Sequence, residues 1–214
     1  MTDDRKGSLA LIAGTLGMLA TMSIHPSGHE LFEPGAFASA ARLAVGAHAL
    51  ALASLPLSFL GALALAQRLA PDRLGLAGLV LYGFALVAGM IAAVVSGLVA
   101  PELARALLAT DAARSEAWQA LLHFNHLLNQ AFAQVLVVAS SAAIVAWSAA
   151  LVRGVALARG AGYGGLLLGP VIVLALVSGH VQLDVHGFGL IVLAQSAWFL
   201  TVGVSLFRAG STAR

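Results

Sequence analysis

The sequence predicts an all-α integral membrane protein: a polytopic helix bundle of six transmembrane helices with both termini in the cytoplasm (N-in/C-in). Of the 214 residues, 60% are hydrophobic and only 9% are charged, whereas a soluble domain carries about 25% charged residues. The apolar residues fall into six long stretches, and a helix needs about 20 of them to cross the hydrocarbon core of a bilayer. These stretches lack the alternation of a barrel strand, so helices are expected.

The six expected spans follow one another in a single transmembrane domain that covers residues 1–214. They are residues 8–24, 43–66, 74–100, 121–151, 163–180 and 188–207. The first stretch resembles a signal peptide, but no small-residue cleavage site follows closely, so we expect it to be retained as a span. Pro56 and Pro170 fall inside the second and fifth spans, where neighbouring helices can satisfy the freed backbone groups.

Basic residues predict the orientation, because cytoplasmic loops carry more Lys and Arg than outer loops. With the N-terminus inside, the cytoplasmic side holds Arg5, Lys6, Arg68, Arg73, Arg153, Arg159, Arg208 and Arg214. The outer side holds Arg42, Arg105 and Arg114. We expect a short amphipathic helix on the outer surface over residues 102–116. Trp118 and Trp147 are expected to anchor opposite ends of the fourth span at the two interfaces.

The composition also narrows the chemistry and the partners. The chain has no cysteine, which excludes disulfides, thiolate zinc sites and cysteine nucleophiles. The net charge of +2 comes from a few arginines beside the membrane and indicates no nucleic-acid partner. We expect a multi-pass protein of the cell inner (plasma) membrane. Its partners are then the lipid bilayer and either another membrane protein or further copies of this chain.

All seven histidines lie on the outer side in this topology. His48 is about one turn into the second span, His123 and His126 open the fourth, and His180 ends the fifth. Neutral imidazole is a common ligand of zinc, copper and iron. We therefore expect an outward-facing pocket that binds a transition metal, a haem or a small ligand. The expected metal ligands are His48, His123, His126, His180 and Asp184.

Three further residues are expected to support this site. Gln130 and Gln134 continue the line of His123 and His126 along one face of the fourth span, which gives a polar stripe two turns deep. His25 ends the first span on the same side of the membrane. The alternative reading is that the stripe only hydrogen-bonds to neighbouring helices.

Two versions of the site differ in their ligands. A haem would lie between histidines of facing helices, with His48 and His126 as the cofactor-binding pair. Met18 and Met22 precede His25 at helical spacing and offer soft sulfur that suits copper(I). Methionines in such positions are more often simply core residues.

The order of these features resembles a known family. Arg42 opens the second span, and His123 or His126 lies near the start of the fourth. Together with a short first span and an outer loop, this arrangement is similar to a bacterial six-span inner-membrane protein family of unknown function. The resemblance covers most of the chain, and it implies six helices without naming an activity.

A different set of residues resembles the site of intramembrane hydrolases of the ceramidase type, which is built around three histidines, an aspartate and a serine. The matching residues are His123, His126 or His180, with Asp184, and Ser96 or Ser178. This resemblance implies a membrane-embedded metal-dependent hydrolase whose ion activates water against a lipid amide or ester. The remaining alternative is a structural or sensor subunit without bound metal, in which clustered histidines titrate between about pH 5 and 8.

Overall fold

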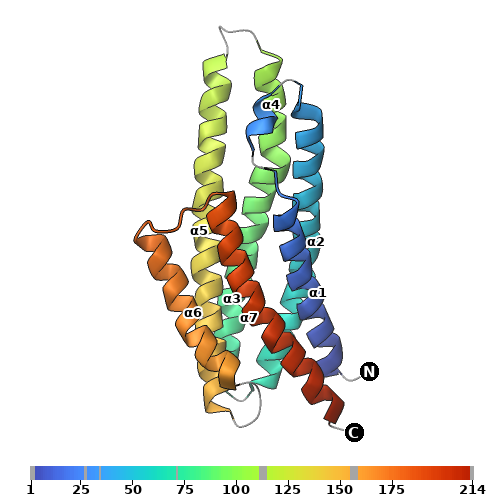
Figure 1. Cartoon of the computed structure of the whole chain (residues 1–214), viewed down its shortest axis with the longest axis vertical. Coiled ribbons are helices and arrows are strands. Elements are labelled where there is room, and N and C mark those ends of the chain that lie inside the picture. Colours follow the sequence, from blue (N-terminus) through green and yellow to red (C-terminus); the bar gives the residue numbers. More distant parts are fainter. Residues whose placement is uncertain are drawn as a thin grey trace.

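The computed structural model describes residues 3–212 except 27, 34, 71, 111–114 and 155–158. Throughout these residues the secondary structure is helical, without a strand, so the predicted all-α class is confirmed. Long helices run side by side along one axis of the molecule (Figure 1), and both termini lie at the same end. Arg114 and Arg214, which entered the orientation argument, lie outside the described residues.

Six long helices form the bundle in the described part of the chain. They are α1 (Asp3–Ser23), α2 (Phe37–Arg68), α3 (Arg73–Val94), α5 (Ser115–Arg153), α6 (Arg159–Val177) and α7 (Val185–Thr212). The shorter elements are the 3-10 turn η1 (His29–Phe32), the π turn η2 (Val95–Val99) and α4 (Ala100–Leu108). Each long helix corresponds to one expected span, and Pro56 and Pro170 lie inside α2 and α6 as predicted.

Five of these helices are long and apolar enough to cross a membrane, judged over the described residues. They are α2, α3 with its continuation to Leu108, α5, α6, and α7 up to Arg208. α1 does not belong to this set, since its first four residues, 3–6, are all charged and reduce its apolar length. The structure therefore shows a multi-pass helical bundle.

Small residues bring α1 close to α2. Gly14 lies against Ser58 and Gly17 lies against Ser54, and a Cβ at either glycine would overlap the serine. Gly61 of α2 lies in the same way against Leu11 of α1. Close helix packing in membranes depends on such small residues, because lipid provides no hydrophobic driving force between helices.

Trp147 occupies the centre of the core and not a membrane interface. Its side chain is fully buried, and its Nε1 donates to the carbonyl of Gly75 on α3 at 3.0 Å. The indole packs against Gly78, where a Cβ would overlap it, and against Tyr82 with ring centroids 5.5 Å apart. The prediction of an interfacial anchor was wrong for Trp147, because the glycine face of α3 accommodates the ring inside the bundle.

The outer amphipathic helix also differs from the prediction. The observed helix, α4, follows α3 directly through the π turn and lengthens it, and the described residues resume at α5 (Figure 1). Arg105 Nη1 pairs with Glu102 Oε2 at 2.8 Å on its exposed side. The helix ends at Leu108, and residues 111–114 of the predicted segment lie outside the described residues.

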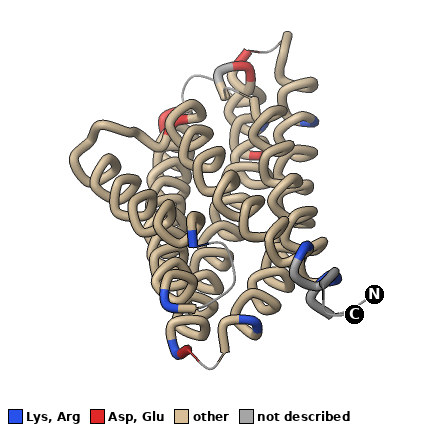
Figure 2. Tube along the Cα trace, turned by 60° about the horizontal axis from the view of Figure 1, so that its bottom comes forward, with Lys and Arg blue, Asp and Glu red and all other residues tan. Residues whose placement is uncertain are grey.

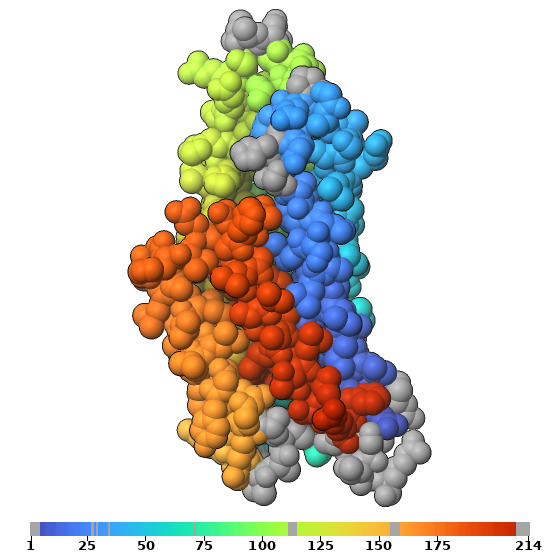
Figure 3. All heavy atoms as spheres, viewed as in Figure 1, coloured from blue at the N-terminus to red at the C-terminus, as the bar shows by residue number. Residues whose placement is uncertain are grey.

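Charged residues are distributed unequally between the two ends of the bundle. Figure 2 shows Lys and Arg mainly at the end that holds both termini, and Asp and Glu mainly at the opposite end. Asp72 is an exception, and it caps α3 by accepting from the Leu74 amide at 2.9 Å. On the face shown in Figure 3, α1 and α7 lie against each other, and the two helices are in contact.

Candidate functional site

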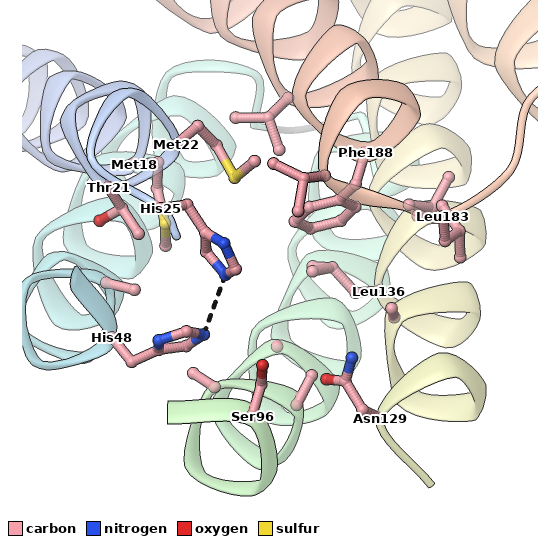
Figure 4. A pocket seen from close by; sticks show the side chains of 18 of the residues that line it. Met18, Thr21, Met22, His25, His48, Ser96, Asn129, Leu136, Leu183 and Phe188 are labelled. Atoms are coloured by element: carbon pink, nitrogen blue, oxygen red, sulfur yellow. Dashed lines mark hydrogen bonds between the residues drawn. The ribbon is translucent and has the colours of Figure 1, made fainter. Parts of the chain in front are cut away.

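A cavity of about 490 Å³ lies between the α1–α7 pair and helices α2, α3 and α5. It reaches from Phe32 and Asp184, near the acidic end of the bundle, to the aromatic core at Tyr82 and Phe199. Most of its lining is aliphatic or aromatic (Figure 4). Cavities of roughly 300–1,000 Å³ with an apolar lining and a few placed polar groups are typical of small-molecule sites.

Polar groups from α1, α2, α5 and α7, from the π turn η2 and from turns that flank these helices interrupt this lining. They are Thr15, Thr21, His25, His48, Ser58, Ser96, Asn125, His126, Asn129, Gln130, Ser140, Asp184, Gln195 and Ser196. Gln195 of α7 accepts from Ser140 at 3.1 Å and donates to Ser141 at 3.0 Å, which ties α7 to α5. Gln130 Nε2 donates to the carbonyl of Leu183 at 3.0 Å and holds the turn before α7.

His25 and His48 face each other in the cavity wall, with their Nε2 atoms 3.3 Å apart (Figure 4). The ring centroids are 4.8 Å apart, and the ring planes are inclined by 66°. Nδ1 of His25 donates to the carbonyl of Pro26 at 2.8 Å, and Nδ1 of His48 donates to the carbonyl of Ala44 at 2.7 Å. A carbonyl oxygen only accepts, so each Nδ1 carries a proton. In the neutral rings both Nε2 atoms therefore present lone pairs to each other.

The π turn of α3 determines where the His48 ring lies. The ring packs against Gly97, where a Cβ would overlap it. The carbonyl of Val95 in this turn accepts from the Ala100 amide and, at 3.3 Å, from the side chain of Asn125 on α5. Single π turns inside helices occur frequently at functional sites. Three helices thus cooperate to hold His48.

The cavity wall contains three of the five expected metal ligands: His48, His126 and Asp184. His123 and His180 are exposed and do not line it. Among the described residues, no group of three or more His, Asp or Glu side chains is placed to hold a metal ion. The predicted convergence of four histidines is therefore not found there, because α5 turns His123 outward and His180 follows the end of α6.

The haem hypothesis needs His48 and His126 to face each other. Both line the cavity, but the Nε2 of His48 that would bind iron is directed at His25. His25, which the sequence suggested only as a supporting residue, is thus the ring nearest the buried histidine. Its proximity was not visible in the sequence, since 23 positions separate the two residues.

The residues of the hydrolase hypothesis are divided between the cavity, which His126, Asp184 and Ser96 line, and the exposed pair of Ser178 and His180. Asp184 Oδ1 accepts from the Gly187 amide at 2.7 Å and so caps the start of α7. His180 Nδ1 is 2.8 Å from Ser178 Oγ, and both side chains are exposed. Ser96 lines the cavity from the π turn, apart from this exposed pair.

The polar stripe of α5 divides between two environments. Gln134 is exposed outside the cavity lining, whereas Gln130 and His126 lie at the cavity edge. Asn125 is buried beside them, although the sequence showed it only flanking the stripe. The signal was present, because Asn125, Asn129 and Ala133 have the same four-residue spacing. α5 thus carries two rows of residues at four-residue spacing, one through His126 and one through Asn125. The buried apolar residues of α5 determine which of the two rows faces inward.

Comparisons of the chain with protein-family models, with curated proteins and with solved structures find no match. The function is therefore argued from the cavity and the side chains that line it.

Proposed function

We propose that this chain is a multi-pass protein of the cell inner membrane whose cavity binds a small, mostly apolar molecule carrying one or two polar groups. One observation supports this most directly: a cavity of about 490 Å³ with an apolar lining lies within a bundle of which five helices are long and apolar enough to cross a membrane. The default reading of such a cavity is a ligand site.

We also propose that α1 is the sixth span and that both termini are cytoplasmic. Residues 7–23, which follow the four charged residues of α1, give an apolar length of about 26 Å, close to the roughly 30 Å of the hydrocarbon core. α1 packs against α2 and α7, both of which are apolar enough to cross the membrane. The excess of basic residues at the end with the termini supports a cytoplasmic location for that end (Figure 2). The end of the cavity at Phe32 and Asp184 then lies toward the outer side.

The lining indicates the kind of ligand. Tyr82, Phe188 and Phe199 provide aromatic surface for an apolar body. Asn129 points into the cavity in Figure 4 and offers both a donor and an acceptor. A molecule with a carbonyl or hydroxyl group at one end of a hydrocarbon or ring system matches this distribution.

Organic extraction of the purified full-length protein, followed by mass spectrometry, tests the proposal. We expect a lipid-soluble compound to co-purify in constant ratio with the wild-type chain. Ala133→Phe fills the cavity from a buried lining position and should remove that compound. Ala131→Phe, on the exposed side of the same helix, is the matched control and should retain it. Equal recovery from wild type and Ala133→Phe, with both folded, would contradict the proposal.

A further inference from the structure

We infer that His25 and His48 bind a copper(I) ion in the cavity wall, with a methionine thioether of α1 as a third ligand. The inference goes beyond the proposed apolar ligand and does not depend on it. It rests on the facing Nε2 atoms, on the composition of their surroundings, and on the way the His48 ring is held.

The hydrogen bonds of the two rings leave their facing nitrogens without a proton. Because Nδ1 of each ring donates to a backbone carbonyl, neither neutral ring has a proton to donate to the other. Two lone pairs 3.3 Å apart repel each other. A cation between them replaces this repulsion with two coordinate bonds, and its binding displaces no proton.

The separation of the two nitrogens is close to the one that a shared metal ion needs. Two imidazole nitrogens bound at about 2.0 Å to one ion lie roughly 3.3 Å apart at a tetrahedral angle and roughly 3.5 Å apart at a trigonal angle. The observed Nε2–Nε2 distance is 3.3 Å. A hydrogen bond through a shared proton usually has about 2.7–3.2 Å between its heavy atoms, so the observed distance lies just beyond that range. The separation is therefore compatible with a shared metal ion.

The residues around the pair select a soft, singly charged ion. Met18 and Met22 line the cavity on the same side as His25, with the end of the Met22 side chain toward Gly189 of α7 (Figure 4), and thioethers favour copper(I). Asp184 is the only carboxylate in the described lining, and it is engaged with the Gly187 amide. With two neutral imidazoles as ligands in an apolar cavity, a monovalent ion costs less to bury than a divalent one.

The site is held in place by groups that do not touch the ion. The carbonyls of Ala44 and Pro26 fix the tautomers, as hydrogen-bond partners of metal-binding histidines generally do. Gly97 allows the His48 ring to pack against the π turn, and Asn125 bonds to that turn. The Nε2 atom of His48 is thus oriented before an ion arrives.

Titration of copper(I) against a chromophoric copper(I) chelator, with the reduced full-length protein in detergent and without oxygen, tests the site. We expect a single ion per chain. His25→Ala and His48→Ala should each weaken binding by roughly 100-fold or more, since loss of an outer-shell partner alone costs 10–100-fold. His186→Ala removes an exposed histidine outside the cavity and should bind as wild type does. Unchanged affinity in both cavity variants, or preference for zinc over copper(I), would overturn the inference.

X-ray absorption at the copper edge of the wild-type protein gives an answer that needs no variant to fold. We expect two imidazole nitrogens at about 2.0 Å and a sulfur at about 2.3 Å. The double variant Met18→Leu/Met22→Leu should lose the sulfur and keep the nitrogens. A wild-type spectrum without imidazole, or sulfur that persists in the double variant, would refute the ligand set. The extraction experiment with Ala133→Phe measures a co-purifying compound, whereas these experiments measure copper. Failure of the copper site and failure of the apolar-ligand proposal are therefore distinguishable.

Discussion

The imidazole ring of His48 on α2 lies directly against Gly97 of α3, at a place where a Cβ would overlap it. The contact falls inside the π turn Val95–Val99, whose altered pitch brings the glycine to the ring. The Nε2 of the same ring is directed at His25. The position of the buried histidine therefore depends on a backbone irregularity and on the absence of one methyl group.

Gly97→Ala should displace the His48 ring and lower the free energy of unfolding by about 1–3 kcal/mol, because the added methyl overpacks a filled space. Thermal unfolding in one detergent measures this loss. Gly46→Ala is the control, since a Cβ at Gly46 meets open space. That variant should be neutral or stabilised by up to about 1 kcal/mol, as expected for removal of a glycine from a helix interior. Equal unfolding temperatures for the two variants would contradict the packing argument.

Asn125→Ala should loosen the π turn. The variant loses the buried hydrogen bond to the Val95 carbonyl, which is worth about 0.5–1.5 kcal/mol. Hydrogen–deuterium exchange should show faster exchange of amides 95–100 than in wild type. Gln119→Ala, at an exposed position of the same helix, should leave that exchange unchanged. Wild-type protection in Asn125→Ala would show that the turn does not need this contact.

Trp147→Phe should destabilise the bundle by about 1–3 kcal/mol, because the buried Gly75 carbonyl loses the indole donor. The measurement is the shift of the thermal unfolding midpoint. Trp118→Phe provides the comparison, since Trp118 is only half-buried near the start of α5. Its expected effect is within about 0.5 kcal/mol. A larger loss from Trp118→Phe than from Trp147→Phe would reverse the assignment of the core tryptophan.

The proposed orientation is testable because the chain has no cysteine of its own. Ser39→Cys and Arg73→Cys place single thiols at exposed positions near the starts of α2 and α3. A membrane-impermeant maleimide added to intact cells should label Ser39→Cys alone. Arg73→Cys should react only after the membrane is permeabilised. The opposite labelling pattern would mean that the termini are outside.

The sequence by itself determined the class of this protein and the positions of its long helices. Apolar composition and the length of each apolar stretch are local properties, and every expected stretch lies within or largely overlaps a long helix. The polar character of the first half of α5 was visible as well. Asn125 and His126 are neighbours on that helix, and both belong to lines with helical spacing.

Only the tertiary structure decided which of these two rows of residues on α5 faces the cavity. A rotation of α5 about its axis changes neither its composition nor its periodicity. The orientation of α5 depends on how Trp147 packs against Gly78 of α3 and bonds to the Gly75 carbonyl. The pairing of His25 with His48 depends in the same way on a third helix, which offers Gly97 to one of the rings. The spacing of residues along one chain contains no information about such a contact, because it is set by the shapes of separate helices packed together.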